Sequence, residues 1–374
     1  MIPLSKPFFD LEELEAVKSA LDSGWVAGQG PKGEELEESV KDFTSKKFAI
    51  AVNNCTAGLH LALLAIGVKN GDEVLVSDFT FPATGHSVLY CKAQPRFVDV
   101  ELATYNINAL QIEKMVNKKT KAIIVVHALG QMANMTDIMA IASKYNLKVI
   151  EDAACSLGAK HNDRMAGSYG DITVFSFHAR KNITSGEGGM IVTDSNIYAK
   201  FIKSHSCFGI ESAKNRENKF SIPKFNSLGF NYKLSDINAA IINVQLKKYS
   251  KIINRKRYLV DLYNSKLKGC EFINIPTELK TNFHVYQTYA IFLDKRINRN
   301  RVIECLREKN IQSQIGTYAS HLLPIYDSND NCPNSALLFN QSLALPLHHA
   351  LTKDDINKVV YELNNAIKNQ IENF

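Results

Sequence analysis

The chain has 374 residues, of which 45% are hydrophobic and 22% are charged. These are the proportions of a globular protein, and they exclude a chain that is disordered throughout. The 44 basic and 38 acidic side chains leave a formal net charge of +6. That excess is small for so long a chain and argues against a nucleic-acid-binding protein. A chain of this length is expected to form two lobes.

The N-terminal segment and the cysteines indicate a protein of a reducing compartment. The first residues lack the basic and apolar regions of a signal peptide, and acidic residues begin at Asp10. No stretch approaches the roughly 20 apolar residues of a membrane-spanning helix. The seven cysteines are widely spaced and form no C-x-x-C pair, so neither a disulfide framework nor a metal site is expected. We therefore expect a cytoplasmic protein with no membrane partner.

Apolar strand patterns alternate with helical patterns in the first half of the chain. A first helix over residues 11–21 is expected to end near Gly24, which suits a C-cap. Continuous apolar runs such as Ile123–Val126 are typical of strands buried on both faces of a mostly parallel sheet. The alternation predicts an α/β layer architecture. The predicted strands span residues 48–52, 73–77, 96–100, 122–127, 148–151, 172–177 and 190–193, with helices over 57–66, 85–90, 109–116 and 137–145.

The second half begins with a long helical pattern over residues 235–267, for which Ser235 is a plausible N-cap. A second set of strands and helices follows, which predicts a smaller C-terminal domain. We place a large domain at residues 1–245 and a small domain at residues 246–374. The predicted elements of the small domain span residues 285–293, 299–309, 311–315 and 354–370.

The segment Gly28–Gly33 matches G-x-G-x-x-G, the fingerprint of a dinucleotide site. In a dinucleotide-binding protein this motif follows a strand and opens a helix. Here a helical pattern precedes it and Pro31 lies inside it, so the segment is predicted to be a loop without a nucleotide. A nicotinamide-dependent dehydrogenase would depend on this match alone.

Two other segments join a predicted strand to polar residues. Small and hydroxyl residues after Asn53 open a predicted helix, whose free N–H groups could bind an anion with help from the Thr56 hydroxyl. The same residues would also form an ordinary N-cap. Asp152 ends a predicted strand, where α/β sheets place their sites, although an acid there can equally cap a helix.

Lys181 lies in a segment that begins as a buried strand and becomes rich in glycine, which lets backbone approach a ligand. Taken alone, such a lysine is more often a solvated surface residue. Together with the anion site and Asp152, however, it completes the set that pyridoxal phosphate chemistry requires. That set is an amine for a Schiff base, an acid that keeps the pyridine nitrogen protonated, and a cup for the phosphate.

These segments resemble the DegT/DnrJ/EryC1/StrS family of sugar aminotransferases over nearly the whole chain. The resemblance implies the fold-type I architecture of pyridoxal-phosphate enzymes: a large domain with a mostly parallel seven-stranded sheet and a smaller C-terminal α+β domain. The matching blocks are Ile2–Pro7, Ser23–Val26, Asn54–Ala57, Phe79–Thr84, Pro95–Val100, Glu151–Ala154, Ser176–Gly189, Leu228–Leu234 and Leu343–Leu347.

The family's roles transfer by position to residues of this chain. The resemblance implies that Lys181 forms the Schiff base and then shuttles protons, with a pKa lowered by burial and by the cationic ring. Asp152 would pair with the pyridine nitrogen, and Phe81 would stack on the ring. Asn231 would reach the phosphate of the other subunit, which implies a homodimer with shared active sites. The phosphate itself would be held by Thr56, Ala57 and Ser176.

The chain departs from the family pattern at three positions. Cys55 stands where the family often has Gly, and Ala27 replaces a hydroxyl residue. Cys155 stands where His or Gln often faces the phenolic oxygen of the cofactor, and a thiol is a weaker hydrogen-bond partner; Cys155 contacts the cofactor or simply packs. A dehydratase subgroup has histidine in place of the Schiff-base lysine, so Lys181 favours transamination.

The resemblance implies an aminotransferase that moves an amino group from an amino acid, with L-glutamate expected, to a nucleotide-linked keto-sugar. A dTDP-, UDP- or GDP-linked 4-keto-6-deoxyhexose is the expected acceptor, for an amino sugar of a polysaccharide such as a lipopolysaccharide O-antigen. A 3-keto sugar is the main rival. A catalytically idle, cofactor-binding regulator is a further alternative, against which the intact Lys181 and Asp152 argue.

Two segments carry candidates for binding the sugar nucleotide. Tyr318 and His321 lie in a segment that resembles a family segment near the active site, although core packing would explain both equally well. Lys224, with Arg216 and Lys219, could meet a diphosphate, although a solvated basic loop is the default interpretation.

Overall fold

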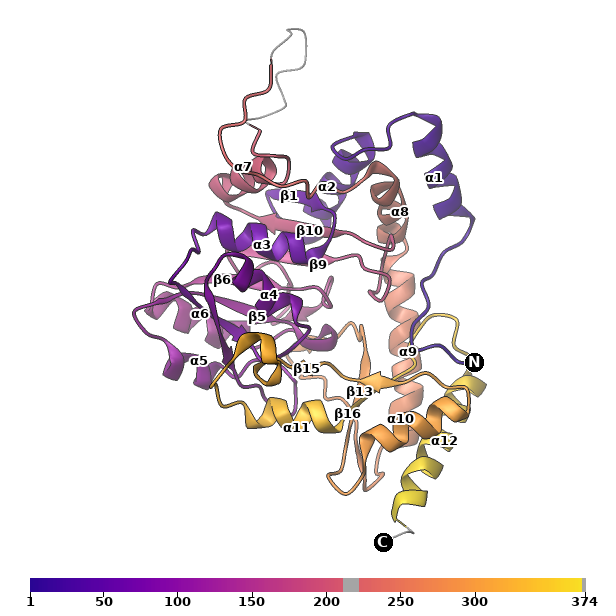
Figure 1. The fold of residues 1–374 in the computed structure, drawn as a ribbon. Helices are drawn as coiled ribbons and strands as arrows, with labels where there is room; N and C mark the ends of the chain where they lie inside the picture. The colour runs from indigo at the N-terminus through magenta and orange to yellow at the C-terminus, as the bar shows by residue number, and fades with distance from the viewer. Residues whose placement is uncertain (211–221, 372–374) are drawn as a thin grey trace.

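The computed structural model describes residues 1–210 and 222–371. Its main feature is a seven-stranded sheet (Figure 1) in which β10 alone runs antiparallel to its neighbours. This confirms the predicted mostly parallel sheet. In spatial order the strands are β1 (Phe48–Val52), β10 (Gly189–Thr193), β9 (Ile172–Ser176), β6 (Lys148–Asp152), β5 (Thr120–Val126), β2 (Glu73–Ser77) and β4 (Gln94–Val98).

The sheet is covered by helices on both faces. Because side chains alternate along a strand, Val74 and Val76 of β2 join one apolar core and Leu75 joins another. The first core also holds residues of α3 (Cys55–Ala65), α4 (Ala83–Tyr90) and α7 (Asn196–His205). The second holds residues of α2 (Pro31–Thr44), α5 (Ala109–Met115), α6 (Met135–Lys144) and α8 (Asp236–Lys247). Burial on both faces explains the continuous apolar runs of the strands.

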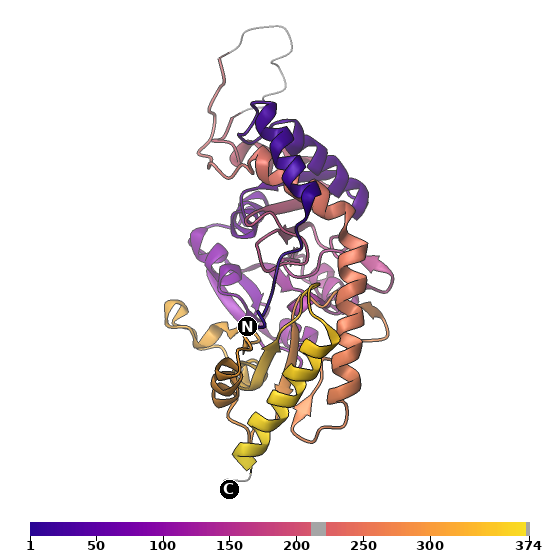
Figure 2. The same cartoon turned by 90° about the vertical axis from the view of Figure 1, so that its right-hand side faces the viewer.

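The C-terminal part forms a smaller layer of its own, as expected. Its four-stranded antiparallel sheet has the order β11 (Ile273–Asn274), β13 (Tyr289–Leu293), β16 (Ser342–Leu345) and β14 (Gln314–Ile315). Helices α10 (Arg299–Glu308) and α12 (Lys353–Ile371) pack against each other beside it. Figure 2 shows the long helix α9 (Tyr249–Leu267) running from the upper part of the molecule down past this layer.

The N-terminal residues pack against the C-terminal layer. The Ile2 backbone exchanges hydrogen bonds with Asn310 and Gln312, and Leu347 donates to the Leu4 carbonyl. Ile2 also belongs to the apolar core of α9, α10 and α12. By these contacts the first residues adjoin the small domain, although the boundary proposed at residue 246 stays a prediction.

The predicted helix over residues 235–267 is wrong in one respect, because it is two helices that meet at Lys248. Ser235 is the N-cap of α8, as predicted, and its hydroxyl accepts from Asn238 N–H. The buried Lys248 ammonium binds the carboxylates of Asp10 and Glu13 at 2.6 and 2.9 Å, which ties α1 (Leu11–Asp22) to this junction. The helices and strands not predicted were α2, α7, β16, α11 (Pro333–Gln341) and the short strands β3 (Phe79–Thr80), β7 (Lys160–His161), β8 (Arg164–Met165), β11, β12 (Asn282–Phe283) and β15 (Tyr318–Ala319).

The glycine motif Gly28–Gly33 is half loop and half helix, so its prediction as a loop was wrong for its second half. Helix α2 begins at Pro31, a residue suited to the first helical position. The N–H groups of Gly30, Lys32 and Gly33 all donate to the buried Asp236 carboxylate, at 3.0–3.2 Å. The motif therefore binds an anion, but one that belongs to the chain itself.

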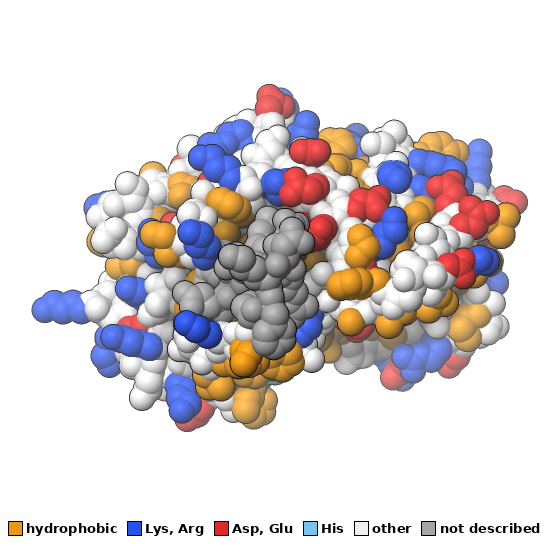
Figure 3. Space-filling model, turned by 90° about the horizontal axis from the view of Figure 1, so that it is seen from above, with side chains coloured by type: hydrophobic (Ala, Val, Ile, Leu, Met, Phe, Trp, Pro, Cys, Tyr) orange, Lys and Arg blue, Asp and Glu red, His pale blue; other side chains and the backbone are white. Residues whose placement is uncertain are grey.

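The surface carries charges of both signs. In the view from above, basic and acidic side chains are interspersed with hydrophobic ones (Figure 3), as the small net charge suggests. None of the helices within the described residues is both long enough and apolar enough to cross a lipid bilayer.

Candidate active site

The predicted site residues gather where parallel strands end. Asp152 closes β6, Ser176 closes β9 and Lys181 lies in the loop after β9. Carboxyl ends of parallel strands share one edge of a sheet, and crevices at that edge are where α/β folds bind ligands. Sequence reasoning placed these residues together, and in the structure the three segments that carry them meet at this edge of the sheet.

Asp152 is a buried carboxylate with few partners. The Thr84 hydroxyl donates to Oδ2 at 2.8 Å, and Ala154 N–H donates to Oδ1 at 3.2 Å. Burial raises the pKa of Asp152 despite these hydrogen bonds, since loss of water disfavours the charged form. A cation brought to this carboxylate would offset that cost. Thr84, which sequence reasoning missed, holds the carboxylate in place.

The Lys181 amine lies beside a thiol. Its Nζ donates to Cys155 Sγ at 3.2 Å, so Cys155 contacts the proposed catalytic amine. Burial lowers the pKa of Lys181, but Cys155, Cys55 and Asp152 favour the charged form, and the net effect raises the pKa. The lowering implied by the family resemblance must therefore come from the positive charge of a bound cofactor.

Lys256 of α9 holds the Lys181 loop from behind, a role that sequence reasoning missed. Its buried Nζ donates to Asn182 Oδ1 at 2.7 Å and to the Gln287 carbonyl at 3.0 Å. Gln287 in turn donates to the Arg180 carbonyl at 2.8 Å. Burial lowers the pKa of Lys256 to about 7, yet a neutral amine still has hydrogens for both acceptors. The residues on both sides of Lys181 are thus fixed to α9 and to the small layer.

Replacement of Lys256 by methionine is expected to lower the free energy of unfolding by about 1–3 kcal/mol, because two half-buried acceptors lose their buried donor. The pKa of Lys256 is lower in the folded chain than its ordinary 10.5. The unfolded chain therefore binds the extra proton, and the wild type gains stability as pH rises from 7 toward 10.5. The loss of stability caused by Lys256→Met should therefore increase between pH 7 and pH 10.5. Chemical denaturation near pH 7 and at about pH 9 measures it, and a penalty equal at both would contradict the argument.

The predicted phosphate cup is built at the start of α3. Asn54 caps this helix, and its side-chain oxygen accepts from Ala57 N–H at 2.8 Å. The N–H groups of Cys55 and Thr56, in the first helical positions, have no intrahelical acceptor, and the Thr56 hydroxyl stands beside them. The Ala57 N–H can donate to a phosphate only if its hydrogen bond to Asn54 is broken, so its contact with the phosphate stays a prediction. The Ser176 hydroxyl, at the end of β9, accepts from His178 N–H at 3.3 Å.

Two segments distant in sequence meet at Phe81. Strand β15 pairs with β3, which brings Tyr318 opposite Thr80. The Tyr318 ring lies edge-on to Phe81 with centroids 6.1 Å apart. Phe81 itself is 65% exposed. A planar ligand would cover it.

His321 follows β15 and is fixed to the buried Asp78, which comes directly after β2. The His321 N–H donates to Asp78 Oδ1 at 2.7 Å, and its Nδ1 lies 2.6 Å from Oδ2. The hydrogen bond to Asp78 raises the pKa of His321. The structure thus places Tyr318 and His321 together near Phe81, which the sequence alone left open.

Asn231 and Lys224 lie on the surface of the single chain. Asn231 is exposed, and its side-chain oxygen accepts from Lys233 at 2.6 Å. Lys224 is exposed as well. Of the other cations of that segment, Arg216 and Lys219 fall outside the described residues. The roles of Asn231 and Lys224 stay predictions.

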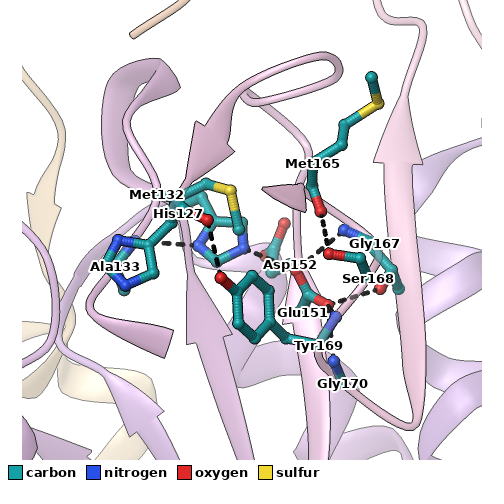
Figure 4. Close-up of polar contacts among 12 residues, drawn as sticks. His127, Met132, Ala133, Glu151, Asp152, Met165, Gly167, Ser168, Tyr169 and Gly170 are labelled. Carbon is teal, nitrogen blue, oxygen red and sulfur yellow. Dashed lines mark hydrogen bonds and ion pairs between the residues drawn. The ribbon is translucent and has the colours of Figure 1, made fainter. Parts of the chain in front are cut away.

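Glu151, the neighbour of Asp152, is completely buried and supports the site (Figure 4). Ala133 N–H donates to Nδ1 of His127, so Nε2 carries the proton and donates to Glu151 at 2.9 Å. N–H groups of residues 167, 169 and 170 donate to the same carboxylate at 2.7–3.1 Å. Burial raises the pKa of Glu151, but these hydrogen bonds outweigh burial and lower the pKa to about 2.

Replacement of Glu151 by glutamine is expected to lower the free energy of unfolding by about 3 kcal/mol, the scale for removing one partner of a buried pair. Both oxygens of the Glu151 carboxylate accept hydrogen bonds from N–H groups. The NH₂ group of the glutamine would therefore face an N–H donor in either orientation of the amide. Thr173→Val, which removes a single 3.2 Å hydrogen bond to Glu151, should cost only about 1 kcal/mol.

The difference in stability between the wild type and the Glu151→Gln variant should depend on pH, because the pKa of Glu151 differs between the folded and unfolded chain. Glu151 titrates at about 2 when folded and near 4.5 when unfolded. Its stabilising effect is complete above pH 4.5 and is lost as pH falls toward 2. Denaturation of the wild type and the glutamine variant should therefore converge in acid. A difference unchanged at low pH would contradict the ionised state of Glu151.

The donor set fits pyridoxal phosphate. Lys181 offers an amine and Asp152 a buried anion in need of a cation. Phe81 offers an uncovered ring, and the start of α3 offers N–H groups for a phosphate. Such an arrangement can hold an aromatic cation with an anionic tail and move a proton beside it.

Comparison with known proteins supports this fit. The model of the DegT/DnrJ/EryC1/StrS aminotransferase family matches residues 8–364. The chain is 37% identical to protein MJ1066 of Methanocaldococcus jannaschii, whose function is uncharacterised, with 98% of this chain and 97% of that protein covered. It is 34% identical to the GDP-perosamine synthase of Caulobacter vibrioides, with 98% of each covered.

Among solved structures, the fold is similar to the sugar aminotransferase Spr1654 of Streptococcus pneumoniae in its PLP form. The TM-score is 0.91, the identity is 26%, and 99% of each chain is covered. The match to the family model spans nearly the whole chain and agrees with the arrangement of Lys181 and Asp152. The chain therefore belongs to the DegT/DnrJ/EryC1/StrS aminotransferase family and is a transaminase of fold type I with pyridoxal phosphate as its cofactor.

Proposed function

We propose that this transaminase moves an amino group from L-glutamate to the keto carbon of a nucleotide-linked 4-keto-6-deoxyhexose. The observation that carries the proposal is the Lys181 amine, held beside Cys155 in the loop between β9 and β10, at the same sheet edge as the Asp152 carboxylate. A relative named GDP-perosamine synthase supports a sugar nucleotide as acceptor. The nucleotide is GDP, UDP or dTDP, and a 3-keto sugar is the rival acceptor.

The protein's residues divide the work of the reaction. When bound, the cofactor withdraws electrons from the carbon that exchanges the amino group. Asp152 keeps a proton on the ring nitrogen by its charge, and Thr84 keeps Asp152 in place. Phe81 covers one ring face, while the start of α3 binds the phosphate. The Lys181 amine would hold the cofactor and would move a proton at the substrate carbon.

Tyr318 and His321 are proposed to contact the sugar. Their support is their position, since the pairing of β15 with β3 sets them beside Phe81. The Asp78–His321 hydrogen bond fixes the imidazole so that its other nitrogen can face a hydroxyl of the sugar. Lys224 is proposed to meet the diphosphate. The product would enter an amino-sugar pathway of a polysaccharide such as an O-antigen.

We propose that the working enzyme is a cytoplasmic homodimer in which Asn231 completes the phosphate site of the partner. Exposed apolar residues support an interface: Leu11 of α1 is 72% exposed and Leu228, near Asn231 in sequence, is 87% exposed. All seven cysteines are free thiols, which suits a reducing compartment. Sedimentation should give about twice 41.8 kDa, and an active monomer would exclude the shared site.

The acceptor is tested with a panel of nucleotide-linked 3-keto and 4-keto sugars, each incubated with the cofactor-loaded enzyme and L-glutamate. Mass spectrometry should detect exchange of the keto oxygen for an amino group in a 4-keto sugar, and isotope-labelled glutamate should supply the nitrogen. Amination of only 3-keto sugars would replace the proposed acceptor. Retention of cofactor without amination of any sugar would favour the regulatory alternative.

A further inference from the structure

A cleft beside Lys181 is lined by cationic and imidazole groups. Its walls come from the N-terminal segment, the Lys181 loop, α9 and the residues after β16. None of the lining residues is acidic. The charged and titratable residues among them are Lys6, Arg180, Lys181, Lys256, His348 and His349.

His348 is the unexplained group in this cleft. Its side chain is buried, with 6% of the residue exposed, yet neither ring nitrogen makes a hydrogen bond among the described residues. The Pro3 carbonyl and the Asp355 carboxylate both favour the protonated imidazole, but neither meets the geometry of a hydrogen bond to it. Buried imidazole nitrogens without partners are rare, because desolvation without a hydrogen bond is costly. A ligand that accepts a hydrogen bond would remove that cost.

The charges around His348 show which ligand would suit. Neither Lys6 nor the Arg180 guanidinium forms a salt bridge or side-chain hydrogen bond within the part of the chain that the structure describes. Burial, together with His349 and Lys6, lowers the pKa of His348 to about 4, as a positive surrounding would. Positive groups without counter-charges, around a free hydrogen-bond donor, match a carboxylate.

We propose that this cleft is a carboxylate subsite for the amino donor, with His348, Lys6 and Arg180 as its binding groups. The inference rests on the proposed use of an amino acid as donor. The nitrogen of that donor must take the place of the Lys181 amine, and its α-carboxylate sits on the adjacent carbon. In a nucleotide sugar, by contrast, the diphosphate lies across the sugar ring from the keto carbon, which places it farther from Lys181.

The test uses glutarate, a dicarboxylate that cannot react because it lacks an amine. Calorimetry with the cofactor-loaded enzyme should detect saturable glutarate binding and none of the uncharged glutaramide. Lys6→Met and His348→Gln should each weaken glutarate binding about 10-fold, the scale of one charge-assisted hydrogen bond. Lys200→Met is the matched control, because Lys200 is an exposed lysine of α7 outside the cleft, and it should bind as the wild type does.

Each other outcome has a defined meaning. Absence of glutarate binding to the wild type, or equal binding by all variants, would overturn the subsite. Weakened binding of inorganic pyrophosphate in place of glutarate would assign the cleft to the sugar nucleotide and also overturn the proposal. Thermal denaturation shows whether His348→Gln unfolds the chain. If it does, Lys6→Met still tests the site, because Lys6 is exposed and its replacement should not affect folding. Glutarate binding with no sugar amination would leave the subsite standing and reject the acceptor.

Discussion

Replacement of Lys181 by alanine is expected to abolish the visible Schiff-base absorbance of the cofactor-loaded enzyme and to slow transamination by roughly 10⁴-fold, the upper range for loss of a general acid–base group. The reason is that one amine both holds the cofactor and moves the proton. Absorbance spectra of the purified protein and initial rates with glutamate measure the two effects separately.

Two controls sharpen this experiment. Lys200→Ala removes an exposed lysine of α7 and should leave both the spectrum and the rate unchanged. Lys181→Arg keeps a positive charge, but a guanidinium stays protonated and cannot exchange the proton, so it should be as inactive as alanine. An alanine variant with the wild-type spectrum would show that another amine holds the cofactor.

Replacement of Asp152 by asparagine is expected to slow transamination by about 10³-fold, the scale for removing one electrostatic contact from an active site. The amide keeps the size of the side chain and can still accept from Thr84, but it brings no charge to the ring nitrogen. The ring would then lose its proton and withdraw electrons less strongly. Rates of the glutamate half-reaction, followed by absorbance, measure this loss.

Thr84→Val is the matched control for Asp152, because it removes the 2.8 Å hydrogen bond but leaves the carboxylate. Its effect should be about 10-fold, as for a single hydrogen bond to a charged group. Equal losses in the two variants would mean that position rather than charge is the contribution of Asp152. A fully active Asp152→Asn enzyme would exclude the proposed pairing with the ring nitrogen.

The sheet and the principal site residues were predictable because their signals are local. Strands over residues 48–52 and 73–77 have the predicted bounds, since a buried parallel strand is a continuous apolar run. Asp152 and Lys181 follow such runs, so the topology alone brings them to one edge. Helix α2 was missed although Leu36 and Val40 have helical spacing; its many charged residues and the glycine motif before it concealed the pattern.

The supporting contacts could not be predicted, because they join residues far apart in the chain. Lys256 reaches Asn182 from α9, and Asp236 reaches back to the N–H groups of the glycine motif. The sequence pattern around Lys256 or Asp236 does not indicate which residue each one contacts. Lys248, at the break between α8 and α9, likewise binds carboxylates at the start of α1. Burial by distant segments, rather than local propensity, decides such contacts.

The most direct test of the account is to locate the cofactor on the chain. Borohydride reduction of the loaded enzyme fixes the cofactor to the amine that holds it, and mass spectrometry of the digested protein identifies the peptide. Lys256 is a genuine competitor, because it lines the same cleft and burial lowers its pKa to about 7. The account predicts that the added mass lies on Lys181. Its presence on Lys256, or on any other lysine, would contradict it.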